Sequence, residues 1–362
     1  MVNKCIRCFI KVLFMAFLLT GCWDSEDIEK KNNISLVIVD FQEEQYRFYV
    51  EIANVYSGNA QSNKVGYSVL EAAGDSLVEA RDELNRRCDF PIFLGATRAV
   101  VVTQRMAENG IEEYVNRLRA DVEYRKSVSI CTSPTEPLMI ISDQPENDRS
   151  IGDAIQHTLD NQSKEGQTFT INVGDVLRTI ALENVGFLIP QMSIDKGENT
   201  LTGYSVFKDA RCIGTIPIKE RKGIMYFLCS EPQFYYELYD EANHYIFEVV
   251  LKKKSIKAMF EEGQVTFKID MSFEYKLHYM DKKTTVTEEQ LKLLSQKLTE
   301  AVEEDLLATI KDSQNTYGCD YLGFYKYFRA SYLSEFKKMN WEEKYKQAEM
   351  KLNVEATTIT EP

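Results

Sequence analysis

The feature that most constrains the fold is a strict alternation of apolar and polar residues at positions 265–279. Successive side chains of an extended chain point to opposite faces, so the apolar residues share one face and the polar residues share the other. The stretch therefore predicts one long, half-buried strand. Residues 245–260 are its predicted antiparallel partner, because the turn between the two runs contains Gly263.

A long amphipathic helix is predicted directly after this hairpin. Thr287 is the expected N-cap, with Glu289 and Gln290 close behind it. The apolar stripe of the helix consists of Leu291, Leu294, Leu298, Val302, Leu306 and Ile310. Burial of each such side chain contributes roughly 1.5–3 kcal/mol, so we expect the stripe to pack on the sheet as core. A further helix from Phe324 and a terminal strand over residues 350–358 are expected after it.

The first half of the chain alternates predicted strands with predicted helices. The pattern gives a strand hairpin (34–40 and 46–55), a helix (69–84), a strand (98–103), a helix (106–119), a strand (127–132) and a helix (173–183). This order is typical of a mixed α/β sheet domain.

The predicted fold class is a multi-domain α+β fold. We expect an N-terminal mixed α/β sheet domain and a C-terminal antiparallel sheet packed by long helices. The predicted divisions are a leader (1–21), a tether (22–33), an N-terminal domain (34–199) with a hinge at 142–166, and a C-terminal domain (200–362) with a small subdomain at 200–235.

The first residues have the pattern of a bacterial lipoprotein processing site. A positively charged start precedes an apolar run at residues 12–19. The lipobox residues are Leu19, Thr20, Gly21 and Cys22. We expect the thiol of Cys22 to accept a diacylglyceryl group, after which cleavage makes it the first mature residue. An uncleaved anchor is the alternative, but the run is shorter than the roughly 20 residues that a membrane-spanning helix needs.

The charge of the chain restricts its partners. The formal net charge is −13, which gives no attraction to nucleic acid or to anionic lipid headgroups. Membrane residence must therefore come from the acyl chains on Cys22. The tether over residues 22–33 can extend about 3.5 Å per residue, roughly 40 Å in all, which keeps the folded part close to the bilayer.

No pattern of a catalytic or metal site is found. The cysteines that follow Cys22 are unevenly spaced, which disfavours a disulfide framework or a zinc site. They are Cys88, Cys131, Cys212, Cys229 and Cys319. The three histidines, at 157, 244 and 278, form no ligand pair, and His278 is expected on the polar face of a strand. We therefore predict no enzyme activity, no metal and no cofactor.

Two serine–lysine pairs have the S-x-x-K spacing of penicillin-binding enzymes, and two clusters of basic residues stand out. Ser205 with Lys208 and Ser334 with Lys337 lack the companion motifs, so both are interpreted as chance matches. The basic clusters are Arg81, Arg86 and Arg87, and Arg117, Arg119, Arg125 and Lys126. They are either salt bridges on helix faces or docking points for an acidic partner surface, and the sequence leaves both open.

Several segments together resemble the Ger(x)C family, the C-subunit lipoproteins of nutrient germinant receptors in endospore-forming bacteria. The matching motif residues are Trp23 and Asp24 after the lipobox; Arg119, Glu123 and Arg125; Gly203, Phe207 and Gly214; and Asp320, Gly323 and Trp341. The chain also contains the family's Phe93-Leu94-Gly95 triplet, but Ala96 stands where the family more often has His. Asp121 is offset by one position from the usual Arg-Asp pair.

The resemblance implies a non-enzymatic, lipid-anchored subunit on the exported outer face of the inner spore membrane. Its implied partners are the membrane and two polytopic subunits, an A subunit and a transporter-like B subunit to which germinant binding is assigned. It also implies three α/β domains, a role in receptor assembly or signal relay, and no small-molecule ligand.

Two other classes of function are weighed against this one. A substrate-binding lipoprotein of an ABC importer would need a ligand cleft between two similar α/β lobes, whereas the two halves of this chain have different patterns. A cell-wall hydrolase is the third alternative, and no catalytic motif supports it.

Overall fold

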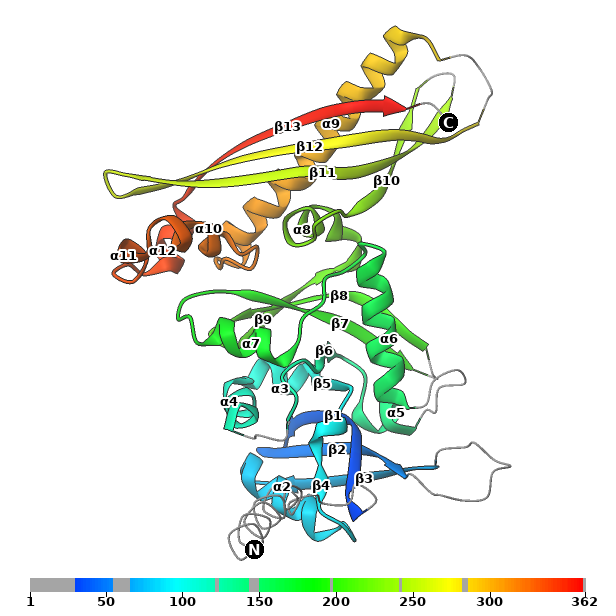
Figure 1. Ribbon diagram of the computed structural model, residues 1–362, viewed down its shortest axis with the longest axis vertical. Coiled ribbons are helices and arrows are strands. Elements are labelled where there is room, and N and C mark those ends of the chain that lie inside the picture. The colour runs from blue at the N-terminus through cyan, green and yellow to red at the C-terminus, as the bar shows by residue number, and fades with distance from the viewer. Residues whose placement is uncertain are drawn as a thin grey trace, which may run out of the picture.

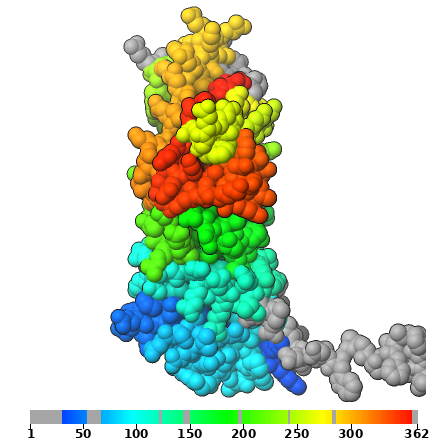
Figure 2. Space-filling model, turned by 90° about the vertical axis from the view of Figure 1, so that its left-hand side faces the viewer, coloured from blue at the N-terminus to red at the C-terminus, as the bar shows by residue number. Residues whose placement is uncertain are grey.

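The computed structural model describes residues 30–54, 66–120, 124–142, 150–195, 198–240, 243–281 and 286–360. These residues form an elongated stack, with the first strands at one end and helix α9 (Glu288–Lys311) at the other (Figures 1 and 2). Two separate sheets organise the stack. The predicted multi-domain α+β fold is confirmed.

The larger sheet has nine strands in the order β3-β2-β1-β5-β6-β7-β8-β9, with β4 paired beside β1. Its centre, from β1 to β7, is parallel, and both flanks are antiparallel. The strands are β1 (Asn32–Gln42), β2 (Gln45–Asn54), β3 (Gly66–Gly74), β4 (Ile92–Phe93), β5 (Ala99–Thr103), β6 (Ser129–Ser133), β7 (Phe187–Asp195), β8 (Glu198–Lys208) and β9 (Arg211–Pro217).

Helices cover both faces of this sheet, because its central strands are apolar on both sides. Every residue of β5 is buried. One face packs under α2 (Leu77–Arg86), α3 (Gln104–Asn109), α4 (Glu112–Ala120) and α7 (Val173–Ile180), and the other under α5 (Pro137–Ser142) and α6 (Ile151–Lys164). Two core clusters result, one on each face.

The smaller sheet has the order β10-β11-β12-β13, and α9 crosses one of its faces (Figure 1). Its strands are β10 (Gln233–Tyr239), β11 (His244–Glu261), β12 (Gln264–Met280) and β13 (Glu349–Thr360). Short helices surround its lower edge: α8 (Arg221–Leu228), α10 (Phe324–Ser331), α11 (Leu333–Phe336) and α12 (Trp341–Lys346), with a π-helical turn η4 (Asp312–Thr316).

The predictions for this half are confirmed with one exception. β11 and β12 form the expected antiparallel hairpin, and the Thr287 side chain accepts from the backbone N–H of Gln290 in a capping box. Most of the predicted stripe of α9 is buried, and Leu291 is half-buried. The exception is β13, which runs parallel to β12 where an antiparallel sheet was expected. The helical segment between the two strands returns the chain to the same end of the sheet, so the pairing must be parallel.

Two helix predictions in the first half are wrong in part. Residues 69–84 form the end of strand β3 followed by α2. Ala72 and Gly74, two positions apart, are buried, whereas Val69 is exposed, and this alternation fits a strand rather than a helix. Residues 106–119 form two helices rather than one. The chain turns at Gly110, whose φ of 120° is a conformation that glycine tolerates and other residues rarely adopt.

The expected boundary between residues 199 and 200 falls inside β8. Residues 200–217 form most of β8 and all of β9, and both strands are hydrogen-bonded into the larger sheet. Within the expected hinge, α6 packs on the sheet through Ile151, Ile155 and Leu159, while residues 143–149 lie outside the described part. Among the described helices, none is both long enough and apolar enough to cross a bilayer.

Candidate functional site: the junction of the two sheets

Asp320 lies just before α10, next to Cys319, which packs against Gly186 immediately before β7 of the larger sheet, and it is completely buried. Its carboxylate accepts hydrogen bonds from the backbone N–H groups of Gly323 (2.9 Å), Phe324 (2.9 Å) and Tyr325 (2.6 Å) at the start of α10. Burial raises the pKa of Asp320 to about 6, although these hydrogen bonds oppose the shift. Gly323 has a φ of 82°, and this left-handed turn lets the N–H groups converge on one carboxylate.

Trp341 provides the fourth hydrogen bond to this carboxylate. Its indole N–H lies 3.0 Å from Asp320, and the ring packs against Phe328 with centroids 5.1 Å apart. Because Trp341 begins α12 and Phe328 belongs to α10, the contact fixes these two helices together. The predicted motif residues Asp320, Gly323 and Trp341 therefore form one buried cluster.

A second group of predicted motif residues lies in strands β8 and β9 of the larger sheet, and one of them, Gly214, packs against Tyr317 of the C-terminal half. Gly203 lies where β8 meets β9, and a Cβ there would be 2.1 Å from the carbonyl oxygen of Ile216. Phe207 is buried and stacks on Phe187 at 5.1 Å. At Gly214, a Cβ would approach the Tyr317 ring to 2.8 Å. Both glycines are thus required by close packing.

Direct contacts join the two groups. The Lys208 ammonium lies 2.9 Å from the Glu342 carboxylate, and the Tyr317 hydroxyl donates to the carbonyl of Thr215 at 3.0 Å. Glu342 also pairs with Lys346. Burial opposes ionisation of Glu342, but its two lysine partners dominate and lower its pKa. The hydrogen bond that Lys208 donates to Glu342 raises the pKa of Lys208. One core cluster runs through the junction, so the two sheets are packed together there.

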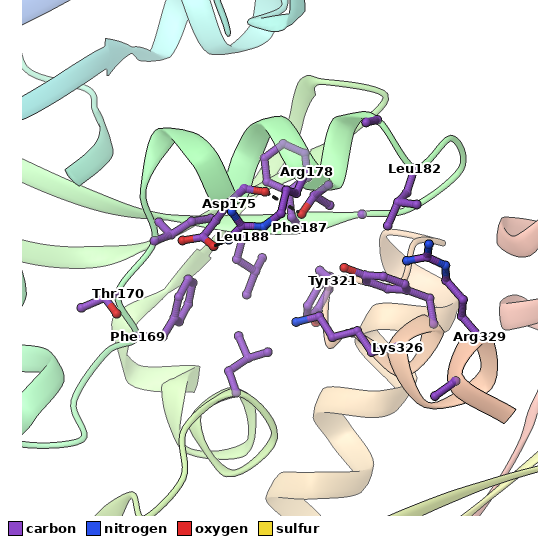
Figure 3. Close-up of a pocket in the computed structure, with 18 of the residues that line it drawn as sticks. Phe169, Thr170, Asp175, Arg178, Leu182, Phe187, Leu188, Tyr321, Lys326 and Arg329 are labelled. Atoms are coloured by element: carbon purple, nitrogen blue, oxygen red, sulfur yellow. Dashed lines mark hydrogen bonds and ion pairs between the residues drawn. The ribbon is translucent and has the colours of Figure 1, made fainter. Parts of the chain in front are cut away.

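An open cleft of about 1040 Å³ lies beside the junction (Figure 3). One wall is formed by α7 and β7 of the larger sheet, and the other by α10 and the start of α11. Phe169, Leu182 and Leu188 contribute apolar surface, and Lys326 and Arg329 project from the opposite wall (Figure 3).

The remaining predicted site residues are not brought to this junction. Arg119 lies in the last turn of α4, a helix that is far from the C-terminal sheet (Figure 1), and Arg125 is exposed. Of the first basic cluster, Arg86 and Arg87 both pair with Glu83, which confirms helix-face salt bridges for these two. The residues Leu19, Thr20, Gly21, Cys22, Trp23, Asp24 and Glu123 lie outside the described residues.

The structure separates the serine–lysine pair at 205 and 208. The Ser205 hydroxyl is buried and lies 2.7 Å from that of Thr132, whereas Lys208 pairs with Glu342. His278 is exposed and packs against Tyr235. Within the described ranges, no three His, Cys, Asp or Glu residues are placed to hold a metal ion. The five cysteines that follow Cys22 are free thiols.

Sequence reasoning missed the half-buried Lys254. Its ammonium donates to the backbone carbonyls of Tyr226 (3.0 Å), Phe227 (2.6 Å) and Cys229 (2.9 Å), which caps the C-terminal end of α8. Burial lowers the pKa of Lys254 to about 8. The sequence shows three consecutive lysines, Lys252 to Lys254, after the apolar run of β11, and nothing in it distinguishes Lys254 from the other two.

The fold and the junction define a class of protein: a multi-domain α+β chain in which two sheets are packed together beside a buried cluster of motif residues. Two family models match it, "Spore germination protein N-terminal domain" over residues 24–194 and "Spore germination B3/ GerAC like, C-terminal" over residues 202–361. The chain therefore belongs to the Ger(x)C family of spore germination proteins.

Individual relatives agree with this assignment. The chain is 25% identical over 200 residues to spore germination protein KC of Bacillus subtilis (strain 168), covering 52% of this chain and 49% of that relative, about half its length. It is 21% identical to the putative spore germination protein YfkR of the same strain, over 96% of this chain and 94% of the relative. The crystal structure of the GerBC protein has the same fold, with a TM-score of 0.52 at 15% identity over 92% of this chain and 100% of that one.

Proposed function

We propose that this protein is the lipid-anchored C subunit of a nutrient germinant receptor and that it acts in receptor assembly or signal relay. It is held on the exported outer face of the inner spore membrane by acyl chains on Cys22. Its partners are the polytopic A and B subunits in the same membrane. Tethering raises the effective concentration of these partners, so protein contacts of modest affinity are sufficient.

The observation that carries the proposal is the use of the motif residues at the junction. Asp320 and Trp341 are occupied by partners inside the fold, as is Lys208 next to the motif residue Phe207, and Gly203 and Gly214 are required by close packing. These side chains stabilise a rigid scaffold and do not present reactive groups to a substrate. A scaffold with this family membership supports a role through protein contacts, without enzyme activity.

The test is replacement of Cys22 in spores. Cys22→Ala should release the chain from the inner membrane fraction and slow nutrient germination as much as deletion of the gene does. Cys88→Ala is the matched control, since this thiol lies in the folded part, and it should leave both properties unchanged. Unaltered membrane fractionation of Cys22→Ala, or normal germination of the deletion strain, would contradict the proposal.

The importer alternative is not favoured by the fold. Its two lobes would be similar, but here a nine-stranded sheet covered on both faces is joined to a four-stranded sheet crossed by one long helix. Titration calorimetry with nutrient amino acids and sugars separates the two hypotheses. We expect no binding in the micromolar range by this subunit alone.

A further inference from the structure

We propose that the cleft beside the junction binds an acidic, partly apolar peptide segment of another receptor-associated protein. This inference rests on the proposed function and names the surface through which that function acts. The cleft lies between α7 and α10 (Figure 3). A bound segment would therefore contact the larger sheet on one side and the helices next to the smaller sheet on the other.

The charge of the cleft is opposite to that of the whole chain. Its lining contains three cations, Arg178, Lys326 and Arg329, and one carboxylate, Asp175, whereas the chain carries a net charge of −13. Arg178 pairs with Asp175. Neither Lys326 nor Arg329 has a carboxylate partner among the described residues, and both side chains are exposed. The α10 wall therefore presents two uncompensated positive charges, which attract carboxylates within a concave surface.

The apolar part of the lining favours a peptide over a small anion. Phe169 and Leu182 are half-buried on one wall, and Leu333 on the other wall is 45% exposed although it is a large apolar residue. A volume of about 1040 Å³ is slightly larger than the 300–1,000 Å³ typical of small-ligand pockets, and this cleft is open to solvent. A segment with carboxylates beside one apolar side chain would cover Leu333 and reach both cations.

The proposal is tested by photocrosslinking in intact spores that carry the full chain. A benzophenone amino acid replaces Leu333, and in a control strain it replaces Leu293, which is exposed on α9 outside the cleft. Mass spectrometry then identifies the crosslinked peptide. We expect the probe at position 333 to capture a segment of another protein that carries at least two carboxylates.

Charge reversal supplies the matched comparison. Lys326→Glu with Arg329→Glu should lower the crosslink yield about tenfold, because attraction becomes repulsion. Lys337→Glu with Lys338→Glu makes the same charge change on exposed residues outside the cleft and should leave the yield unchanged. The membrane-fraction level of each variant reports folding, which exposed side chains should not affect.

Several results would overturn the proposal: a yield at position 333 no higher than at 293, capture of a second copy of this chain, capture of a segment without carboxylates, or a yield insensitive to charge reversal. Germination of the deletion strain distinguishes a failure of the cleft proposal from a failure of the proposed function. If deletion impairs germination while the cleft gives one of these results, the cleft proposal fails and the proposed function stands. If deletion has no effect, the proposed function itself fails.

Discussion

Replacement of Asp320 by alanine should be among the most destabilising single changes in the C-terminal half. The change leaves three backbone N–H groups and the Trp341 indole N–H buried without an acceptor. At about 1.5–2 kcal/mol each, four unsatisfied donors cost about 6–8 kcal/mol. Removing a carboxylate whose pKa is raised from 3.8 to about 6 returns about 3 kcal/mol at pH 7. The net loss in the free energy of unfolding should be about 3–5 kcal/mol.

The pH dependence gives this prediction a second, independent signature. Because the folded state holds a proton on Asp320 up to about pH 6 and the unfolded chain releases it near 3.8, folding is favoured at low pH and loses stability as the pH rises between these values. Asp320→Asn cannot titrate. The stability advantage of the natural chain over this variant should therefore shrink by about 2.4 kcal/mol between pH 4 and pH 7.

Urea unfolding of a Cys22→Ala form at pH 4, 5.5 and 7 measures both effects. Trp341 fluorescence reports the junction locally, which avoids assuming that a multi-domain chain unfolds in one step. An Asp320→Ala loss below about 1 kcal/mol would refute the hydrogen-bond reasoning. An advantage over Asp320→Asn that grows with pH would refute the assigned direction of the pKa shift.

Three further perturbations address the junction and the α8 cap. A double-mutant cycle with Lys208→Met and Glu342→Gln should give a coupling free energy of about 1 kcal/mol at pH 7. This coupling should disappear as the pH falls through the lowered pKa of Glu342, and zero coupling at low salt would contradict the ion pair. Gly214→Leu should cost about 1–3 kcal/mol in thermal or urea unfolding, and less when Tyr317 is alanine, because the clash is with that ring. Lys254→Met leaves three carbonyls without a donor but removes an ammonium whose pKa is lowered to about 8, so the net cost at pH 7 should be about 1–3 kcal/mol. It should also abolish a rise in stability between pH 8 and 10.5, since the unfolded chain binds that proton more tightly; an unchanged slope would count against this role.

The sequence predicted best where structure is decided locally. The alternation at residues 265–279 and the capping box at Thr287 produced β12 and α9 almost as expected, because side-chain period and cap geometry depend on neighbours in the chain. The helix expected at 69–84 failed because apolar spacing at Val69 and Ala73 fits both periods, and pairing with β2 decides for a strand. The direction of β13 depends on the path of the intervening chain, which no local pattern records.

The site was predictable as a set of motifs and not as an arrangement. Resemblance identified Asp320 and Trp341, but their hydrogen bond depends on the path of α10 and α12. The Lys208–Glu342 pair joins residues that are 134 positions apart in the sequence. In the sequence, Lys326 and Arg329 have the pattern of an ordinary exposed helix face. Such contacts arise only when two sheets are packed together.

The most direct test of the central claim is the mass of the mature N-terminus in dormant spores. Peptides from the inner membrane fraction should begin at Cys22 and carry a diacylglyceryl group on its sulfur. An intact leader, or an unmodified Cys22 on material that still fractionates with the membrane, would contradict it.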